Sequence, residues 1–164
     1  MMRWRKAMLT LGICSTLLLG ACSSKEESHD NHSNHTEHTD SGDIREETSG
    51  IEQIPEFLAD KSEDMQTIYV AAAKHQKLLE QIPCYCGCGE SANHKNNYDC
   101  FVFENKESGA VVWDDHGTKC GVCLEIAAQA VVDFNNGKKV KEIRGAIDQQ
   151  YEKGYAKPTN TPEV

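Results

Sequence analysis

The chain has 164 residues, with 26 acidic and 17 basic side chains and a formal net charge of −9. This length fits one small domain with appended segments and leaves no room for a second independent core. The acidic balance argues against nucleic-acid binding, because a phosphate backbone favours clustered lysine and arginine. Eight cysteines exceed what packing requires, so lipid attachment, disulfide bonds or metal ligation must account for most of them.

The N-terminus is typical of an export signal. Three basic residues among the first six precede an apolar run that ends at Leu19, which is too short to span a membrane comfortably. The run closes on Leu19-Gly20-Ala21-Cys22, which resembles the lipobox of bacterial lipoproteins. We therefore expect residues 1–21 to be a lipoprotein signal peptide and Cys22 to carry lipid such as palmitate at the outer face of the cell membrane. A plain cleavable signal or a retained signal anchor is the alternative.

Residues 22–54 are expected to be the lipidated cysteine and a disordered tether. Almost no large apolar residue occurs there, so the segment cannot bury enough surface to offset its chain entropy. Histidine recurs at every third position from residue 29 to residue 38, and imidazoles on a flexible chain can bind zinc, copper or nickel weakly. A polar spacer is the simpler interpretation. The four histidines are His29, His32, His35 and His38.

Ordered structure is expected over residues 55–157, before a disordered tail at 158–164. Ser62 and the acidic pair after it predict the start of a helix over 63–81, which Pro83 cannot continue. Residues 84–99 lack an apolar period and predict a loop. Segments 101–103 and 110–113 are compatible with a short hairpin or with buried irregular chain. Two more helices are predicted, over 119–136, where Gly137 ends the helix, and over 138–154. The expected fold class is a mainly α domain of three to four helices, with two cysteine-bearing loops and room for one short β-hairpin.

Six cysteines of the mature chain fall in two motifs and one isolated position. The motif Cys84-Tyr85-Cys86-Gly87-Cys88 places three thiols within five residues. Such close neighbours pair poorly in disulfides, which need a restricted distance between α-carbons, but they converge easily on a metal ion. The motif Cys120-Gly121-Val122-Cys123 lies at a predicted helix N-terminus, where the helix dipole favours thiolate over thiol.

The ligand count indicates a thiophilic ion, copper(I) or zinc. Six thiolates and two histidines suffice for two tetrahedral zinc sites, and six thiolates alone could hold a small copper(I) cluster. The mature chain has a single methionine, so the thioether-rich style of copper carrier is absent. The predicted ligands are Cys84, Cys86, Cys88, Cys100, Cys120 and Cys123, with His94 and His116 as secondary candidates.

Two other readings of these cysteines stay open. Outside the membrane, six cysteines could form three disulfides, each of which would stabilise a domain of this size by about 2–4 kcal/mol. The protein would then be a disulfide-stapled structural or interaction module. Thiol–disulfide exchange by Cys120 and Cys123 is the third reading, although the alternation of strands and helices of a thioredoxin-like fold is missing.

Together these motifs resemble a known family. Pro83-Cys84-Tyr85-Cys86-Gly87-Cys88, the turn Trp113-Asp114-Asp115-His116-Gly117 and Cys120-Gly121-Val122-Cys123, with His94 and Cys100, are similar to the PCYCGC-motif lipoproteins of Bacillus-type bacteria. The resemblance covers residues 51–158 and implies a surface-anchored, cysteine-rich domain of a Gram-positive bacterium. It implies no activity, because the family is described as having no known function.

We expect a membrane-anchored extracytoplasmic metal-binding protein and not an enzyme. The sequence contains no zincin helix, nucleophile elbow or phosphate-binding glycine loop. The expected partners are the membrane, through the N-terminal lipid, and the metal ion; the sequence identifies no protein partner.

Overall fold

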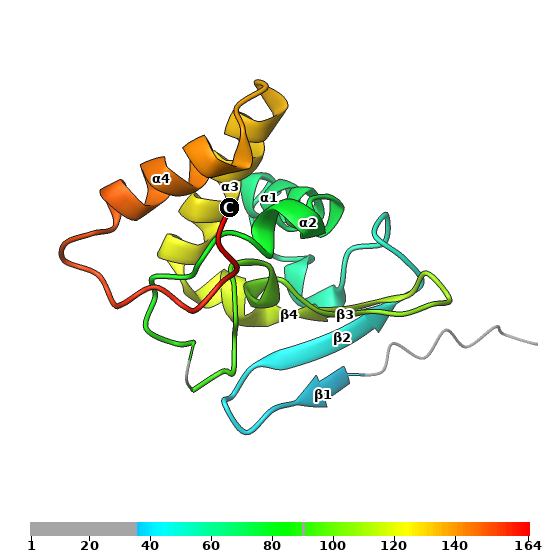
Figure 1. Ribbon diagram of the computed structural model, residues 1–164. Helices are drawn as coiled ribbons and strands as arrows, with labels where there is room; N and C mark the ends of the chain where they lie inside the picture. Colours follow the sequence, from blue (N-terminus) through cyan, green and yellow to red (C-terminus); the bar gives the residue numbers. More distant parts are fainter. Residues whose placement is uncertain (1–35, 90) are drawn as a thin grey trace, which may run out of the picture. The chain divides into compact units, whose positions relative to one another are not determined.

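The strands come from two distant parts of the chain. The structure, a computed structural model, describes residues 36–89 and 91–164. Strands β1 (Thr36–His38) and β2 (Ile44–Thr48) form one hairpin, and β3 (Val102–Asn105) and β4 (Val111–Asp114) form another. Because β2 pairs with β4, all four strands join in one antiparallel sheet of order β1-β2-β4-β3 (Figure 1).

The prediction of a mainly α domain is wrong, because the fold is mixed α/β. The expected hairpin is confirmed as β3–β4, but β1 and β2 lie where a disordered tether was expected, and that expectation fails for residues 36–48. Strand β2 has no alternating apolar residues and is fixed by buried polar groups instead. Trp113 Nε1 donates to Thr48 Oγ1 at 2.8 Å, and the backbone N–H of Glu56 donates to the carboxylate of Glu46 at 2.8 Å. Hydrophobic patterning carries no signal of such a strand.

The three expected helices are present with shorter bounds. Helix α1 (Glu63–Lys74) begins where the Ser62 hydroxyl accepts a hydrogen bond from the N–H of Met65, as an N-cap residue does. The chain breaks at His75 before a single turn, α2 (Gln76–Leu79). Helices α3 (Gly121–Asn135) and α4 (Val140–Gln150) complete the set. Among the described residues, no helix has the length and apolar character that a membrane crossing requires.

The helices lie on one side of the sheet, and α3 contacts α1, α2 and α4 (Figure 1). Side chains of α1 and β4 meet in the core between them, where Tyr69 and Trp113 are fully buried. Tyr69 also donates a hydrogen bond from its hydroxyl to the carbonyl of Asp114 at 3.0 Å. This core brings the N-terminus of α3 next to the end of the sheet.

The C-terminal segment is tied to the first cysteine motif, so the expected disordered tail is wrong for its first residues. The N–H of Thr159 donates to the carbonyl of Cys84 at 3.1 Å, and the N–H of Cys84 donates to Thr159 Oγ1 at 2.9 Å. Further along, Thr161 Oγ1 accepts from Arg144 on α4 at 2.7 Å. These polar contacts come from a segment of low hydrophobicity, which is why the composition did not reveal them.

Candidate metal centre

Four segments meet where the two cysteine motifs come together. The loop after Pro83 supplies Cys84 and Cys86, and the short 3-10 helix η2 (Tyr98–Cys100) supplies Cys100. The N-terminal end of α3 supplies Cys120 and Cys123, and the 3-10 helix η3 (Asp115–Lys119) supplies His116. The folding of the core, and not sequence proximity, therefore assembles the site.

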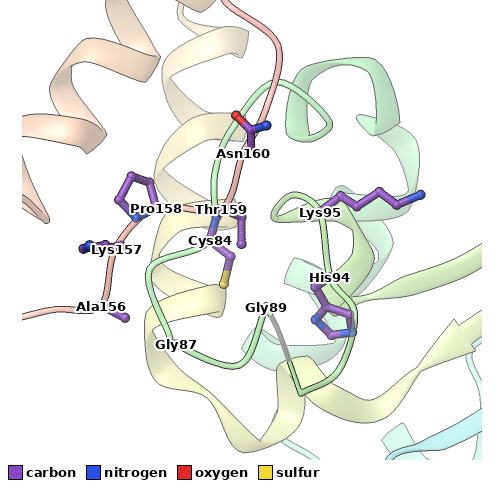
Figure 2. Close-up of a pocket in the computed structure, with 10 residues that line it drawn as sticks. All are labelled: Cys84, Gly87, Gly89, His94, Lys95, Ala156, Lys157, Pro158, Thr159 and Asn160. Atoms are coloured by element: carbon purple, nitrogen blue, oxygen red, sulfur yellow. Dashed lines mark hydrogen bonds between the residues drawn. The ribbon is translucent and has the colours of Figure 1, made fainter.

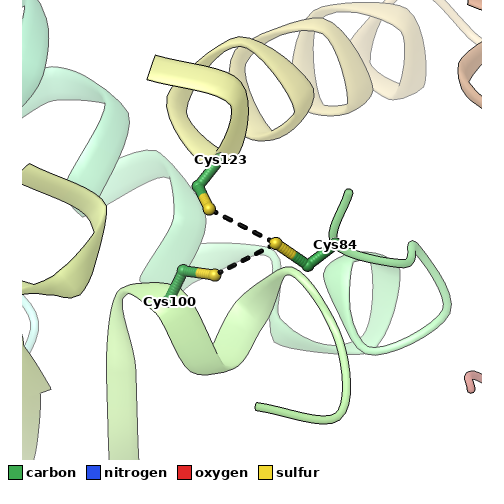
Figure 3. Close-up of side chains that lie close together, drawn as sticks. All are labelled: Cys84, Cys100 and Cys123. Carbon is green, nitrogen blue, oxygen red and sulfur yellow. Dashed lines mark hydrogen bonds between the residues drawn. The ribbon is translucent and has the colours of Figure 1, made fainter. Parts of the chain in front are cut away.

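The buried sulfurs point toward one another. Cys84 Sγ lies 3.3 Å from Cys123 Sγ and 3.7 Å from Cys100 Sγ, as Figure 3 shows. Cys86 Sγ lies 3.0 Å from Cys84 Sγ on the more exposed side. Cys84, Cys100 and Cys123 are almost completely buried, and all six described cysteines are free thiols. The predicted ligand set requires sulfurs of the loop and of the C-x-x-C helix to meet, and Cys84 and Cys123 do so.

Both candidate histidines lie beside the sulfurs. His94 Nδ1 is 3.5 Å from Cys100 Sγ, and the rings of His94 and His116 are 4.5 Å apart in an edge-to-face arrangement. His116 Nδ1 is 3.2 Å from a carboxylate oxygen of Asp43. Since an ionised carboxylate only accepts hydrogen bonds, Nδ1 carries the proton and Nε2 is left as the donor atom for a metal.

The donor atoms form two groups with one shared member. Within each group the ligand atoms lie within 4.8 Å of one another: Cys84, Cys100 and Cys123 in the first, and Cys86, His116 and Cys123 in the second. Sulfur and imidazole nitrogen in close groups are the donors that zinc and copper prefer. Each group could hold a metal ion.

Hydrogen bonds among the sulfurs divide the cluster into thiolates and thiols. The pKa of Cys86 is lowered to about 4, because its sulfur accepts hydrogen bonds from Cys120 and Cys123. The pKa of Cys100 is lowered to about 7 by its hydrogen bonds with Cys123 and Cys84. The pKa of Cys123 is raised instead, because hydrogen bonds with Cys100 and three other cysteines retain its proton. The neighbouring sulfurs thus affect the pKa of Cys123 more than the helix N-terminus does, although the helix N-terminus was expected to favour the thiolate.

The histidines have opposite shifts. Hydrogen bonding to Cys86 raises the pKa of His116 to about 9, and Asp43 adds to the effect. Burial lowers the pKa of His94, and the neighbouring positive charge of His116 lowers it further. In the metal-free protein, His116 is therefore the cation that balances the Cys86 thiolate.

Besides His94 and Cys120, the predicted ligand Cys88 also lies outside both groups. Its sulfur is 3.9 Å from the carbonyl oxygen of Cys86, and burial raises its pKa to about 11. Cys120 lies beside Cys86, with which it hydrogen-bonds. Of the tether histidines, His38 belongs to strand β1 and pairs with Ile44, which contradicts its place in a flexible chain. His29, His32, His35 and Cys22 lie outside the described residues.

The carboxylates beside the site are already paired. Asp43, Asp114 and Asp115 also come within 4.8 Å of one another. Lys119 Nζ lies 3.2 Å from Asp43 and 2.9 Å from Asp115, and Arg45 Nε lies 3.1 Å from Asp114. We therefore assign these acids to positioning and charge balance. Asp43 is a contributor that sequence reasoning missed, since it lies in a polar stretch with no motif.

A cavity of about 680 Å³ opens beside Cys84. It lies between the C-terminal segment, residues 156–160, and the loops that carry Cys84, Gly89 and His94 (Figure 2). A Cβ atom at Gly89 would lie 2.6 Å from Thr159 Cγ2, so this segment approaches the loop as closely as glycine allows. Cys84 lines this cavity although only 1% of the residue is exposed.

Comparison with known proteins gives one match. The sequence model of the family described as "Protein of unknown function with PCYCGC motif" matches residues 11–164. Neither the curated proteins nor the solved structures contain a match.

Proposed function

We propose that this protein, which belongs to the PCYCGC family, binds a thiophilic metal ion through its clustered cysteines. The observation that carries the proposal is the set of buried, free sulfurs within 3.3–3.7 Å of Cys84. If these buried positions served only packing, apolar side chains would fill the same space without thiol groups. Thiols in contact, with imidazoles beside them, suit an ion that binds sulfur and nitrogen.

Zinc and copper(I) both suit these donors. Zinc prefers four tetrahedral sulfur and nitrogen ligands, and copper(I) accepts thiolates in lower coordination. The imidazoles of His94 and His116 next to the sulfurs favour zinc. The burial of three sulfurs suits copper(I), because it shields the ion from oxidation in solvent. The proposal therefore covers both ions, and their relative affinities distinguish them.

The test is a competition titration of the reduced protein. Zinc and copper(I) are each titrated against a chromophoric chelator with the full chain purified in detergent. We expect the wild type to withdraw metal from the chelator and Cys123→Ser to lose at least tenfold in affinity. Cys88→Ser is the matched control, because it removes a thiol of the same motif that lies in neither donor group. Equal affinities for both variants and wild type would overturn the proposal.

The proposed location is the outer face of the cell membrane, with lipid on Cys22. The support is the Leu19-Gly20-Ala21-Cys22 sequence after an apolar run. Two or more acyl chains hold a protein stably at a bilayer. Cys22→Ala should stop incorporation of labelled palmitate and release the protein from the membrane fraction. Unchanged labelling would refute this anchor.

The tether histidines are proposed to raise the local metal supply. His29, His32 and His35 recur at one spacing in a polar stretch, and imidazole is a ligand that zinc, copper and nickel accept. Replacing these three by alanine should slow loading of the cysteine cluster at limiting zinc without changing its affinity. An unchanged loading rate would show that these histidines do not supply metal and that the stretch acts only as a spacer.

A further inference from the structure

The two donor groups meet at Cys123. Its sulfur belongs to the group with Cys84 and Cys100 and also to the group with Cys86 and His116. Cys123 is fully buried at the N-terminal end of α3, and its thiol hydrogen-bonds with four other cysteines. One sulfur thus lies between two sets of ligands.

We propose that the cluster binds two metal ions and that the thiolate of Cys123 bridges them. The inference rests on the proposed function and specifies its stoichiometry and connectivity. Each ion would have three sulfur ligands and one imidazole nitrogen, with the Cys123 sulfur counted in both sets.

The first ion would be bound by Cys84, Cys100, Cys123 and His94. Zinc–sulfur bonds of about 2.3 Å and zinc–nitrogen bonds of about 2.0 Å place tetrahedral ligands about 3.8 Å apart for two sulfurs and about 3.5 Å for sulfur and nitrogen. The observed separations are 3.7 Å from Cys84 to Cys100 and 3.5 Å from Cys100 to His94 Nδ1. The Cys84–Cys123 distance of 3.3 Å is slightly shorter and would widen on binding.

The second ion would be bound by Cys86, Cys120, Cys123 and His116. Cys120 and Cys123 are three residues apart at the start of α3, so they face the same side of the helix. Cys86 hydrogen-bonds with both of them and with His116. Asp43 holds His116 Nδ1 at 3.2 Å, which turns Nε2 toward the sulfurs.

Ligand number and charge both favour two ions over one. A tetrahedral ion uses four ligands, whereas seven donor side chains converge here. With one divalent ion in the first group, the half-buried sulfurs of Cys86 and Cys120 would stay without a metal, and the single imidazolium of His116 could balance only one of them as a thiolate. A second divalent ion neutralises them, and the protons leave to solvent as it binds.

The stoichiometry is tested by native mass spectrometry of the reduced full chain loaded with zinc. The four tether histidines are replaced by alanine in every sample, so that they cannot add ions. We expect two zinc ions per wild-type chain, one for Cys100→Ser, one for Cys86→Ser and two for the control Cys88→Ser. One ion on the wild type would overturn the two-ion site and leave the proposed function standing. No ion would overturn both.

The bridge is tested on the same chain with cadmium-113 in place of zinc, because two cadmium nuclei that share a sulfur show mutual spin coupling. We expect two resonances in the range of sulfur-rich ligation, each split by the other. Two unsplit resonances would overturn the bridge. This measurement uses unsubstituted cysteines, so it does not depend on whether a cysteine variant folds.

Discussion

Cys84 Sγ and Cys123 Sγ lie 3.3 Å apart although 39 positions separate the two residues in the chain. The loop that carries Cys84 and the first turn of α3 are therefore in contact at the cluster. An ion bound to both sulfurs closes this long loop, and closing a long loop restricts the unfolded chain most. Metal binding and folding stability should therefore be coupled.

Zinc should raise the free energy of unfolding. An ion that binds only the folded state adds about 2.7 kcal/mol when its free concentration is a hundredfold above Kd. Thermal unfolding of the reduced protein with zinc and with a chelator measures the shift. Magnesium is the control, because it prefers oxygen ligands and should leave Tm unchanged. An identical Tm with zinc and with chelator would contradict the coupling.

Asp43→Asn should lower metal affinity without removing a ligand. The neutral amide weakens the hold on His116 Nδ1, which Asp43 contacts at 3.2 Å. Loss of such a partner costs about 10- to 100-fold in metal affinity, and we expect the lower end because the amide oxygen still accepts a hydrogen bond. Asp60→Asn is the matched control, since Asp60 is exposed and pairs with Lys61. Equal affinities in the chelator competition would show that Asp43 does not position the histidine.

Thr159→Val should expose Cys84 to reagents. It removes the acceptor of the Cys84 N–H at 2.9 Å and should cost about 1 kcal/mol of stability. Alkylation of Cys84 by iodoacetamide, followed by peptide mass spectrometry, should be faster than in wild type. Thr161→Val removes a hydrogen bond of the same segment to Arg144 and should leave the Cys84 rate unchanged. Equal rates in both variants would mean that the C-terminal segment does not protect this thiol.

Gly117→Ala should destabilise the fold beneath the site. Its Cβ would lie 2.8 Å from the Phe101 ring and from the Tyr69 hydroxyl, and overpacking of this kind costs about 1–3 kcal/mol. Gly121→Ala meets no atom within 4 Å at the start of α3, so it should be neutral or slightly stabilising. Urea unfolding of both variants checks the contrast. Equal stabilities would refute the packing described for Gly117.

The chemistry of the candidate site was more predictable than the fold. The motif around Cys84 and Cys86 and the helix signals beside Cys123 are local, so they predict a cysteine-bearing loop and a cysteine-bearing helix. That the two meet depends on the tertiary fold. The exclusion of Cys88 could not be predicted, because it depends on the direction in which the loop turns. Asp43 was equally hidden, since it reaches His116 only after β1 and β2 join the sheet.

The sheet was missed because its first two strands are held by polar contacts. Glu46 and Thr48 are buried in β2, where hydrophobic patterning predicts exposed residues. Their partners, Glu56 and Trp113, are fixed only by the tertiary fold. A segment rich in acidic residues and threonine therefore forms strands here for reasons that composition does not carry.

The most direct test of the metal-binding claim is the intact mass of the protein purified from its native membrane without reductant. Native spectra should show added zinc or copper mass, and denatured spectra should show all six domain cysteines as thiols. A chain without metal, lighter by two hydrogens for each of three disulfides, would contradict the account and leave a disulfide-stapled module.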